Sequence, residues 1–297
     1  MKITDMRVTP VAVPLKPVAS ASKMRIGPRV LLAVLVEIDT DEGITGIGES
    51  PCFLGNDLCS EILMSARPYL LGKDPRNINR LMKELYVQYN LVHLHIHSAS
   101  WAFSGIEMAL WDILGKRTGL PLYKVWGGAY RKKIEFIGSI ERQEPEGMEK
   151  EAARLAAEGF RVLFTKVGLV PEDDLAAVAA MRKGAPDRNV KIRVDANQAW
   201  STGRAVSMIN RMAEYGLECV DQPTIMYNLD ALKLVKDSVS TPIAGHESGW
   251  TMYDVLNVIK ADAVDYIHID GRFDAGYYGA RISAGMAEAA GIQCIHH

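Results

Sequence analysis

Cysteine is scarce in this chain, and its spacing does not match that of zinc sites. The four cysteines are scattered along the 297 residues, at Cys52, Cys59, Cys219 and Cys294. Cys219 and Cys294 fall in apolar, strand-like segments, so we expect both to be buried, reduced thiols. Few cysteines without a disulfide pattern are typical of a reducing compartment, and the sequence predicts a cytoplasmic protein.

The chain also lacks a charge excess, a long apolar run and a signal sequence. Its 34 Lys and Arg residues balance 36 Asp and Glu residues, so the charge gives no indication of nucleic-acid binding. The longest clearly apolar stretch, residues 30–36, is far too short to span a bilayer, and the N-terminus has no apolar signal-peptide core. No GxGxxG pattern follows a strand, which argues against a dinucleotide site. The sequence therefore predicts a globular protein without nucleic-acid or membrane partners.

The first part of the chain, residues 1–130, predicts an α+β domain. It begins with segments in which apolar and polar residues alternate or β-branched residues are frequent, with a turn between them. Helical patterns follow, and Gly119 and Pro121 end the last of them. Strand patterns cover residues 3–10, 30–38 and 44–49, and helical patterns cover residues 59–70, 77–86 and 98–118.

Residues 131–297 alternate short apolar runs with amphipathic helical stretches, which predicts βα units, a parallel sheet and a (β/α)8-type TIM barrel. Strands are expected at residues 134–138, 162–166, 190–195, 218–221, 242–244, 266–270 and 292–295. Helices are expected at residues 145–158, 172–183, 201–215, 229–237, 252–260 and 280–290. Because seven barrel strands precede His297, we expect a barrel truncated after strand 7, with its C-terminal end missing.

Three acidic residues follow successive apolar runs: Asp195, Asp221 and Glu247. The carboxyl ends of barrel strands form the catalytic face, so these carboxylates are expected to converge there. Hard divalent cations such as Mg²⁺ take oxygen ligands. A single acid after a strand is usually a helix cap or an ion-pair partner, but three at near-equal spacing favour a metal site.

Two longer motifs resemble those of the enolase superfamily and, within it, the mandelate racemase subgroup. Residues 102–116 (AFSGIEMALWDILGK) are similar to the first signature of the family. Residues 193–197 (RVDAN), followed by residues 221–223 (DQP), are similar to the second. The resemblance covers essentially the whole chain, and it implies an N-terminal capping domain and a modified TIM barrel.

The resemblance also implies a chemistry. In the family, Mg²⁺ and a base abstract the proton α to a carboxylate, because a carbanion beside a carboxylate gathers two negative charges that a preorganised cation stabilises. The metal ligands implied are Asp195, Asp221 and Glu247. Position 221 is more often Glu in the family, so this site has one shorter ligand. Family members are usually homo-oligomers that act on small-molecule carboxylates, and we expect the same here.

Lys166 is the first candidate base. It ends an expected strand and matches the second lysine of the Lys-x-Lys motif of the family. The first lysine of that motif is replaced by Phe164, which removes the usual contact with the substrate carboxylate and one cation near Lys166. Without the resemblance, a lysine at a strand end would be read as a solvated surface residue.

A second candidate base is His297, paired with Asp270. The muconate-lactonizing subgroup would carry a lysine at position 270, whereas mandelate racemase relatives carry an aspartate that orients a histidine after the seventh strand. A carboxylate fixes the tautomer of an imidazole and stabilises its cation. His296 is an alternative partner, and both histidines are also compatible with a plain chain end.

Other residues are weaker candidates for substrate contacts. Asn197 follows the first ligand and His246 precedes the third. Lys23 and Arg25 lie in an expected specificity loop, where a solvated charge is the plainer interpretation. The histidines at positions 93, 95 and 97 alternate, but we interpret them as packing or interface residues.

These observations predict a Mg²⁺-dependent enzyme that abstracts the proton α to a carboxylate. Dehydration of an acid sugar to a 2-keto-3-deoxy acid ranks first, because it is the commoner outcome in the subgroup that the chain resembles. Racemisation or epimerisation of a 2-hydroxy acid such as mandelate is the alternative, since Phe164 leaves an apolar corner. A lactonizing or amino-acid racemase member and a non-catalytic metal-binding scaffold are further alternatives.

Overall fold

The computed structural model describes residues 1–14, 30–52, 55–90, 96–274 and 276–297, which form two compact units. Of these residues, those up to 132 and those from 270 to 283 belong to unit 1, and the remainder belong to unit 2. The domain boundary expected at residue 130 stays a prediction, because compact units are not by themselves independently folding domains.

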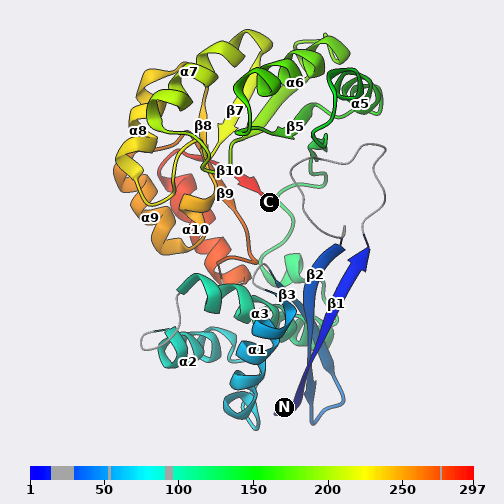
Figure 1. Cartoon of the computed structure of the whole chain (residues 1–297). Coiled ribbons are helices and arrows are strands. Elements are labelled where there is room, and N and C mark those ends of the chain that lie inside the picture. Colours follow the sequence, from blue (N-terminus) through cyan, green and yellow to red (C-terminus); the bar gives the residue numbers. More distant parts are fainter. Residues whose placement is uncertain (15–29, 53–54, 91–95, 275) are drawn as a thin grey trace. The chain divides into compact units, whose positions relative to one another are not determined.

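Unit 1 contains an antiparallel sheet and the helices that pack on it (Figure 1). The sheet has the order β1-β2-β3, with β1 at Ile3–Pro14, β2 at Val30–Thr40 and β3 at Thr45–Pro51. The helices are α1 (Asn56–Leu70), α2 (Ile78–Asn90), α3 (Ile96–Thr118) and the short α4 (Leu122–Val125). In the described part of the chain, no helix is long and apolar enough to cross a membrane.

Glycines allow α3 to approach β3 closely. A Cβ atom on Gly48 would lie 2.0 Å from the carbonyl oxygen of Gly105, and one on Gly105 would lie 2.3 Å from Oγ of Ser50. Ser50 Oγ donates a hydrogen bond to the Ala102 carbonyl oxygen at 2.6 Å, which satisfies a fully buried hydroxyl at this contact. The helix and strand therefore pack backbone to backbone, and larger side chains on either would separate them.

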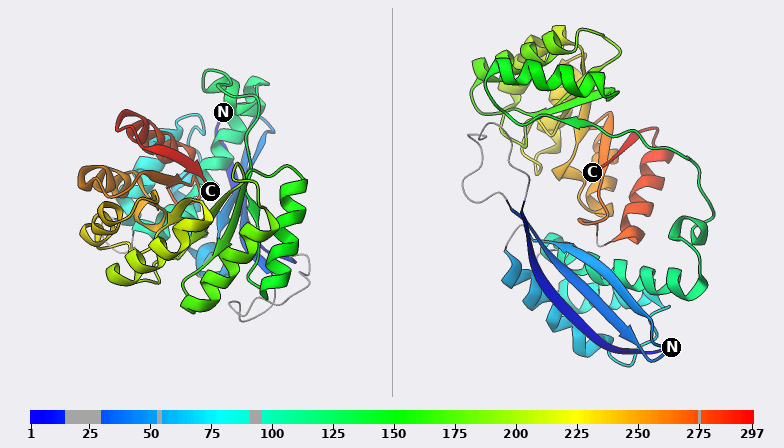
Figure 2. Two further views of the ribbon diagram at one scale, coloured as in Figure 1. Left: turned by 90° about the horizontal axis from the view of Figure 1, so that it is seen from above. Right: turned by 90° about the vertical axis from the view of Figure 1, so that its right-hand side faces the viewer.

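Unit 2 contains a parallel sheet in the order β10-β9-β8-β7-β6-β5-β4, with helices outside its curve (Figure 2, left). Its strands are β4 (Gly138–Ser139), β5 (Val162–Lys166), β6 (Lys191–Asp195), β7 (Leu217–Asp221), β8 (Ile243–Gly245), β9 (Tyr266–Ile269) and β10 (Gln293–His296). The strand order follows the chain order, as successive βα units require. This confirms the α/β fold class with a sheet of barrel type.

The helices of the βα units begin where the sequence provides caps. Ser201 accepts a hydrogen bond from the backbone of α7, Asn228 does so for α8, and Thr251 forms a capping box with Asp254 at the start of α9. The helices are α5 (Pro145–Ala157), α6 (Pro171–Gly184), α7 (Thr202–Met212), α8 (Leu229–Ser238), α9 (Met252–Ala261) and α10 (Tyr277–Ala289), with 3-10 turns η1 (Ala213–Tyr215) and η2 (Glu247–Gly249).

Two expectations from the sequence are wrong. The strand expected at residues 134–138 is reduced to β4, which pairs with β5 over two residues only, and Ile134 and Phe136 are about three-quarters exposed at 75% and 76%. Cys294 is exposed rather than buried, because β10 is the last strand of the described sheet and has a neighbour on one side only. Cys219, on the central strand β7, is buried as expected.

Candidate active site

The carboxyl ends of β5, β6 and β7 bring the first predicted site residues together. Lys166, Asp195 and Asp221 end these three strands and are register partners, Lys166 with Asp195 and Asp195 with Asp221. Lys166 Nζ donates to Oδ2 of Asp195 at 2.5 Å and to Oδ1 of Asn197 at 2.6 Å. The candidate base and two candidate ligands are therefore direct neighbours at one edge of the parallel sheet.

Both aspartates are almost fully buried, Asp195 at 2% exposure and Asp221 at 1%. Burial is the largest influence on the pKa of the Asp195 carboxyl and raises it; the Lys166 ammonium opposes this shift, and the negative charge of Asp221 adds to it. Two buried carboxylates side by side are costly unless positive charge compensates them. The site therefore favours a cation.

Glu247 reaches the same edge from the turn after β8. Its Oε1 accepts a hydrogen bond from Nδ2 of Asn197 at 2.9 Å, and its Oε2 is buried without a hydrogen-bond partner among the described residues. Asn197 has a positive φ of 42°, which turns the chain after β6 so that its backbone amide also donates to Oδ1 of Asp195 at 2.7 Å. Asn197 thus connects two candidate ligands and Lys166.

Gln222 is a residue whose role was not predicted from the sequence. Its fully buried Oε1 accepts hydrogen bonds from the backbone of His246 at 2.9 Å and from the backbone and hydroxyl of Ser248 at 3.1 and 2.9 Å. These contacts fix the turn that carries Glu247. The residue belongs to the DQP motif, but nothing in the sequence indicated which loop its amide would hold.

The oxygen donors fit a hard divalent cation. Three carboxylates, Asp195, Asp221 and Glu247, lie 6% exposed or less at the ends of neighbouring strands, and one Glu247 oxygen is buried without a hydrogen-bond partner in the described part of the chain. No three His, Cys, Asp or Glu side chains among the described residues lie close enough to form a complete cage; Lys166 occupies one oxygen of Asp195, and Asn197 one oxygen of Glu247. Mg²⁺ suits such a set because it keeps several water or substrate ligands.

Three imidazole rings pack against one another beside the carboxylates. The ring centroids of His246 and His297 are 4.6 Å apart, and those of His246 and His268 are 4.7 Å apart. His246 Nδ1 lies 3.8 Å from Oε2 of Glu247, and His268 Nε2 lies 3.1 Å from Oδ2 of Asp221. His297 and His246 were predicted site residues; His268 was not, because a histidine inside an apolar strand has no distinguishing spacing.

Asp270 forms an ion pair with a residue of its own loop. It lies in unit 1, and its carboxylate accepts hydrogen bonds from the Arg272 backbone at 2.8 Å and from the guanidinium at 2.5 and 3.0 Å. Arg272 is thus an ion-pair partner of Asp270. His297 lies in unit 2, where its backbone amide donates to the Ile269 carbonyl oxygen at 3.3 Å. The Asp270–His297 dyad stays a prediction.

Phe164 lies two residues before Lys166 on the same face of β5, and Lys166 Nζ is 5.5 Å from the centroid of its ring. The half-buried ring therefore provides an apolar wall beside the candidate base. The predicted substrate-loop residues Lys23 and Arg25 lie outside the described residues, as do the side chains at positions 93, 95 and 97.

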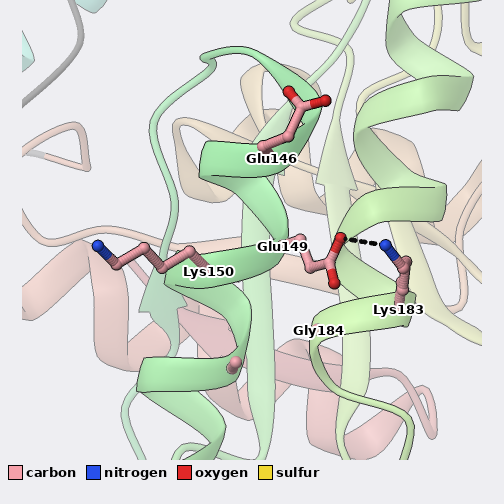
Figure 3. A pocket seen from close by; sticks show the side chains of 6 residues that line it. Glu146, Glu149, Lys150, Lys183 and Gly184 are labelled. Carbon is pink, nitrogen blue, oxygen red and sulfur yellow. Dashed lines mark hydrogen bonds and ion pairs between the residues drawn. The ribbon is translucent and has the colours of Figure 1, made fainter.

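A surface hollow between α5 and α6 contains none of the predicted site residues (Figure 3). Glu149 and Lys183 point toward each other in it and form an ion pair at 2.7 Å, whereas Lys150 points away. The hollow is lined by Glu146, Glu149, Lys150, Ala153, Lys183 and Gly184. It lies between two helices rather than at the strand ends, so we assign it no part in the chemistry.

Comparison with known proteins extends over nearly the whole chain. Residues 3–127 match the mandelate racemase/muconate lactonizing enzyme N-terminal domain, and residues 147–297 match the enolase C-terminal domain-like family. The chain is 34% identical over 307 residues to L-Ala-D/L-Glu epimerase of Bacillus subtilis, covering 99% of this chain and 80% of that protein. It is 29% identical over 269 residues to arabinonate dehydratase of Saccharolobus solfataricus, covering 89% of this chain and 74% of the relative.

A solved structure shares the fold and contains the expected metal. The crystal structure of an enolase from Bradyrhizobium complexed with magnesium and mandelic acid has a TM-score of 0.90 and 26% identity, and the match covers 100% of this chain and 81% of that one. The chain is thus similar, in sequence and in structure, to enzymes that share one fold and catalyse different reactions. The chain belongs to the enolase superfamily, within its mandelate racemase subgroup, and is an enzyme.

Proposed function

We propose that this enzyme uses Mg²⁺, bound by Asp195, Asp221 and Glu247, to abstract the proton α to a substrate carboxylate, with Lys166 as the base. The observation that carries the proposal is the contact between Lys166 and Asp195, which places an amine at 2.5 Å from a buried carboxylate at the strand ends. A base in this chemistry must lie beside the carbon while the cation faces the carboxylate oxygens.

Each candidate site residue has a separate role in this proposal. When bound, Mg²⁺ supplies positive charge opposite the substrate carboxylate as negative charge develops there. Lys166 Nζ takes the α-proton, and Asn197 holds that nitrogen at 2.6 Å through Oδ1. His297, oriented by Asp270, is proposed to deliver or remove a proton on the opposite face, as the sequence predicts. Lys23, Arg25 and His246 are proposed substrate contacts.

The fate of the α-carbon decides the reaction. If an acid protonates a departing β-hydroxyl, the product is a 2-keto-3-deoxy acid, and acid-sugar dehydration is the outcome that we rank first. A relative named as a dehydratase supports this ranking. We propose His297 as that acid, since its ring stacks on that of His246, the residue before the candidate ligand Glu247. The substrate class is then a polyhydroxy monocarboxylate or dicarboxylate.

One observation favours a second outcome, racemisation or epimerisation at the α-carbon. The Phe164 ring lies beside Lys166, with Nζ 5.5 Å from its centroid, so an apolar substituent would be better accommodated there than a hydroxylated chain. A relative named as an epimerase and a solved structure containing mandelic acid agree with this alternative. A substrate of this kind would be a 2-hydroxy acid with an aromatic or branched group.

One screen separates the two outcomes. The protein is incubated with Mg²⁺ in ²H₂O and, separately, with acid sugars, with aryl or alkyl 2-hydroxy acids and with amino acids, and both 2-keto acid formation and α-²H incorporation are measured. Keto acid formation identifies a dehydratase, and exchange without keto acid identifies a racemase or epimerase. Exchange of amino acids alone would support the amino-acid racemase alternative. Mg²⁺ binding with neither product across the screen would contradict the proposed catalytic roles and favour the scaffold.

A further inference from the structure

His268 lies next to a candidate metal ligand, although the metal chemistry of the site does not require it. It is on β9, is 5% exposed, and places Nε2 at 3.1 Å from Oδ2 of Asp221. Its ring packs against that of His246 at 4.7 Å with a 38° tilt. A buried imidazole held between a strand and another ring cannot move far, so the fold keeps Nε2 close to this carboxylate.

The two oxygens of Asp221 have different surroundings. Oδ1 is 3.5 Å from the thiol of Cys219, which is a weak donor, and Oδ2 faces His268 Nε2. We assign the imidazole proton to Nε2 because that nitrogen faces a carboxylate oxygen. Asp221 has no lysine or arginine within ion-pair distance among the described residues, in contrast to Asp195, which has Lys166. Neither ring nitrogen of His268 makes a hydrogen bond among the described residues, so Nε2, at 3.1 Å, is an unused potential donor beside this carboxylate.

We propose that His268 is a positioning residue for Mg²⁺: a small rotation of its ring lets Nε2–H donate to the Asp221 carboxylate and hold it in the rotamer that binds the metal, without His268 coordinating the ion itself. The inference rests on the proposed metal site, in which Asp221 is a ligand. A hydrogen bond to one oxygen leaves the remaining lone pairs of the carboxylate for the cation. Hydrogen-bond partners of metal-binding carboxylates change metal affinity by about 10-fold to 100-fold when they are removed.

The test is Mg²⁺ titration calorimetry on the full chain after removal of divalent ions with a chelator. His268→Leu keeps the volume but loses the donor, and we expect Mg²⁺ affinity to fall by about 10-fold to 100-fold. His268→Gln places an amide N–H near the position of Nε2, and its affinity should be closer to that of the original protein than to that of the leucine variant. Tyr266→Phe, two residues earlier on the same strand, is the matched control and should not change Mg²⁺ affinity.

A second measurement asks whether His268 coordinates the ion directly. Mn²⁺ replaces Mg²⁺, and pulsed electron paramagnetic resonance detects nitrogen coupled to the ion. The proposal predicts no directly bound imidazole nitrogen, and a strong nitrogen coupling lost in His268→Leu would overturn it by making His268 a ligand. If His268→Leu does not fold, as judged by circular dichroism, His268→Met supplies the apolar variant of similar reach.

The outcomes separate this inference from the proposed function. Unchanged Mg²⁺ affinity in folded His268→Leu would overturn the positioning role and leave the metal site standing. Absence of Mg²⁺ binding to the original protein would overturn both. Loss of affinity in His268→Leu, recovery in His268→Gln and no change in Tyr266→Phe would establish the role, because a merely structural contribution would not be restored by an amide donor.

Discussion

Replacing Glu107 by glutamine should change how the stability of unit 1 depends on pH. The Glu107 carboxyl is fully buried and accepts hydrogen bonds from the backbone of Tyr277 at 2.8 Å, the backbone of Tyr278 at 3.0 Å and the Trp111 indole at 2.6 Å. It therefore caps the first turn of α10 from a position 170 residues earlier in the chain. A Cβ on Gly276 would lie 2.1 Å from Oε2, which shows how tightly the carboxyl is enclosed.

The size of the expected change in the free energy of unfolding follows from the pKa of the Glu107 carboxyl. Burial, the largest influence, raises the pKa of Glu107 from 4.5 to about 7, although the three N–H donors oppose the shift. A folded pKa above the unfolded value means that the carboxyl contributes stability below pH 4.5 and loses that contribution as the pH rises through about 7. Each pKa unit corresponds to 1.36 kcal/mol, so the loss between pH 5 and 8 is about 2–3 kcal/mol.

The assay compares urea unfolding of the original protein with that of Glu107→Gln at pH 5, 6, 7 and 8. Tryptophan fluorescence reports on the region because the Trp111 indole contacts Glu107. The stability advantage of the original protein over the variant should shrink by about 2–3 kcal/mol from pH 5 to pH 8. Glu61→Gln, on an exposed position of α1, is the matched control and should show a constant difference.

A stability advantage of the original protein over Glu107→Gln that grows with pH would refute this reasoning. It would mean that the three donors and the positive end of the α10 dipole stabilise the anion more than burial destabilises it, so that the folded pKa lies below 4.5.

Three further predictions concern backbone contacts and the site. Gly48→Ala should destabilise the protein by about 3 kcal/mol or more in urea unfolding, because its Cβ would meet the Gly105 carbonyl oxygen at 2.0 Å; an unchanged midpoint would contradict the close packing of α3 on β3. Gly168→Ala combines a φ of +104° with a contact of 2.7 Å to Ala199, so it should lower the α-exchange rate by displacing the loop after Lys166, and full activity would contradict that loop geometry. Gln222→Ala leaves three donors without their acceptor, so it should cost about 2–4 kcal/mol and weaken Mg²⁺ binding in calorimetry; full Mg²⁺ affinity would show that the turn carrying Glu247 does not depend on it.

Local patterns predicted most of the parallel sheet, because each strand is an apolar run that ends at a polar residue. Asp195 and Asp221 could be placed at strand ends for this reason, and their register pairing follows from the parallel order. Lys166 could be placed at the end of the neighbouring strand by the same argument; the structure puts its Nζ 2.5 Å from Asp195, and its catalytic role stays a prediction.

Contacts between distant segments could not be predicted in this way. The sequence indicated a start at residue 280 for the last helix, whereas α10 begins at Tyr277 because Glu107 caps it from another element. Gln222 and His268 were missed for a related reason, since their importance comes from the residues that the fold places opposite them. The prediction of a strand at residues 134–138 was wrong. The apolar side chains of this segment stay exposed, and β4 pairs with β5 over two residues only.

The central claim is that Lys166 removes an α-proton from a carboxylate held by Mg²⁺, and one measurement tests it most directly. With a substrate from the screen, α-²H exchange is followed for the original protein, for Lys166→Ala and for the surface control Lys183→Ala, while Mg²⁺ binding is measured in parallel. The account predicts that Lys166→Ala keeps its fold and binds Mg²⁺ but loses exchange, whereas Lys183→Ala retains it. Exchange that continues in a folded, Mg²⁺-bound Lys166→Ala variant would contradict the account.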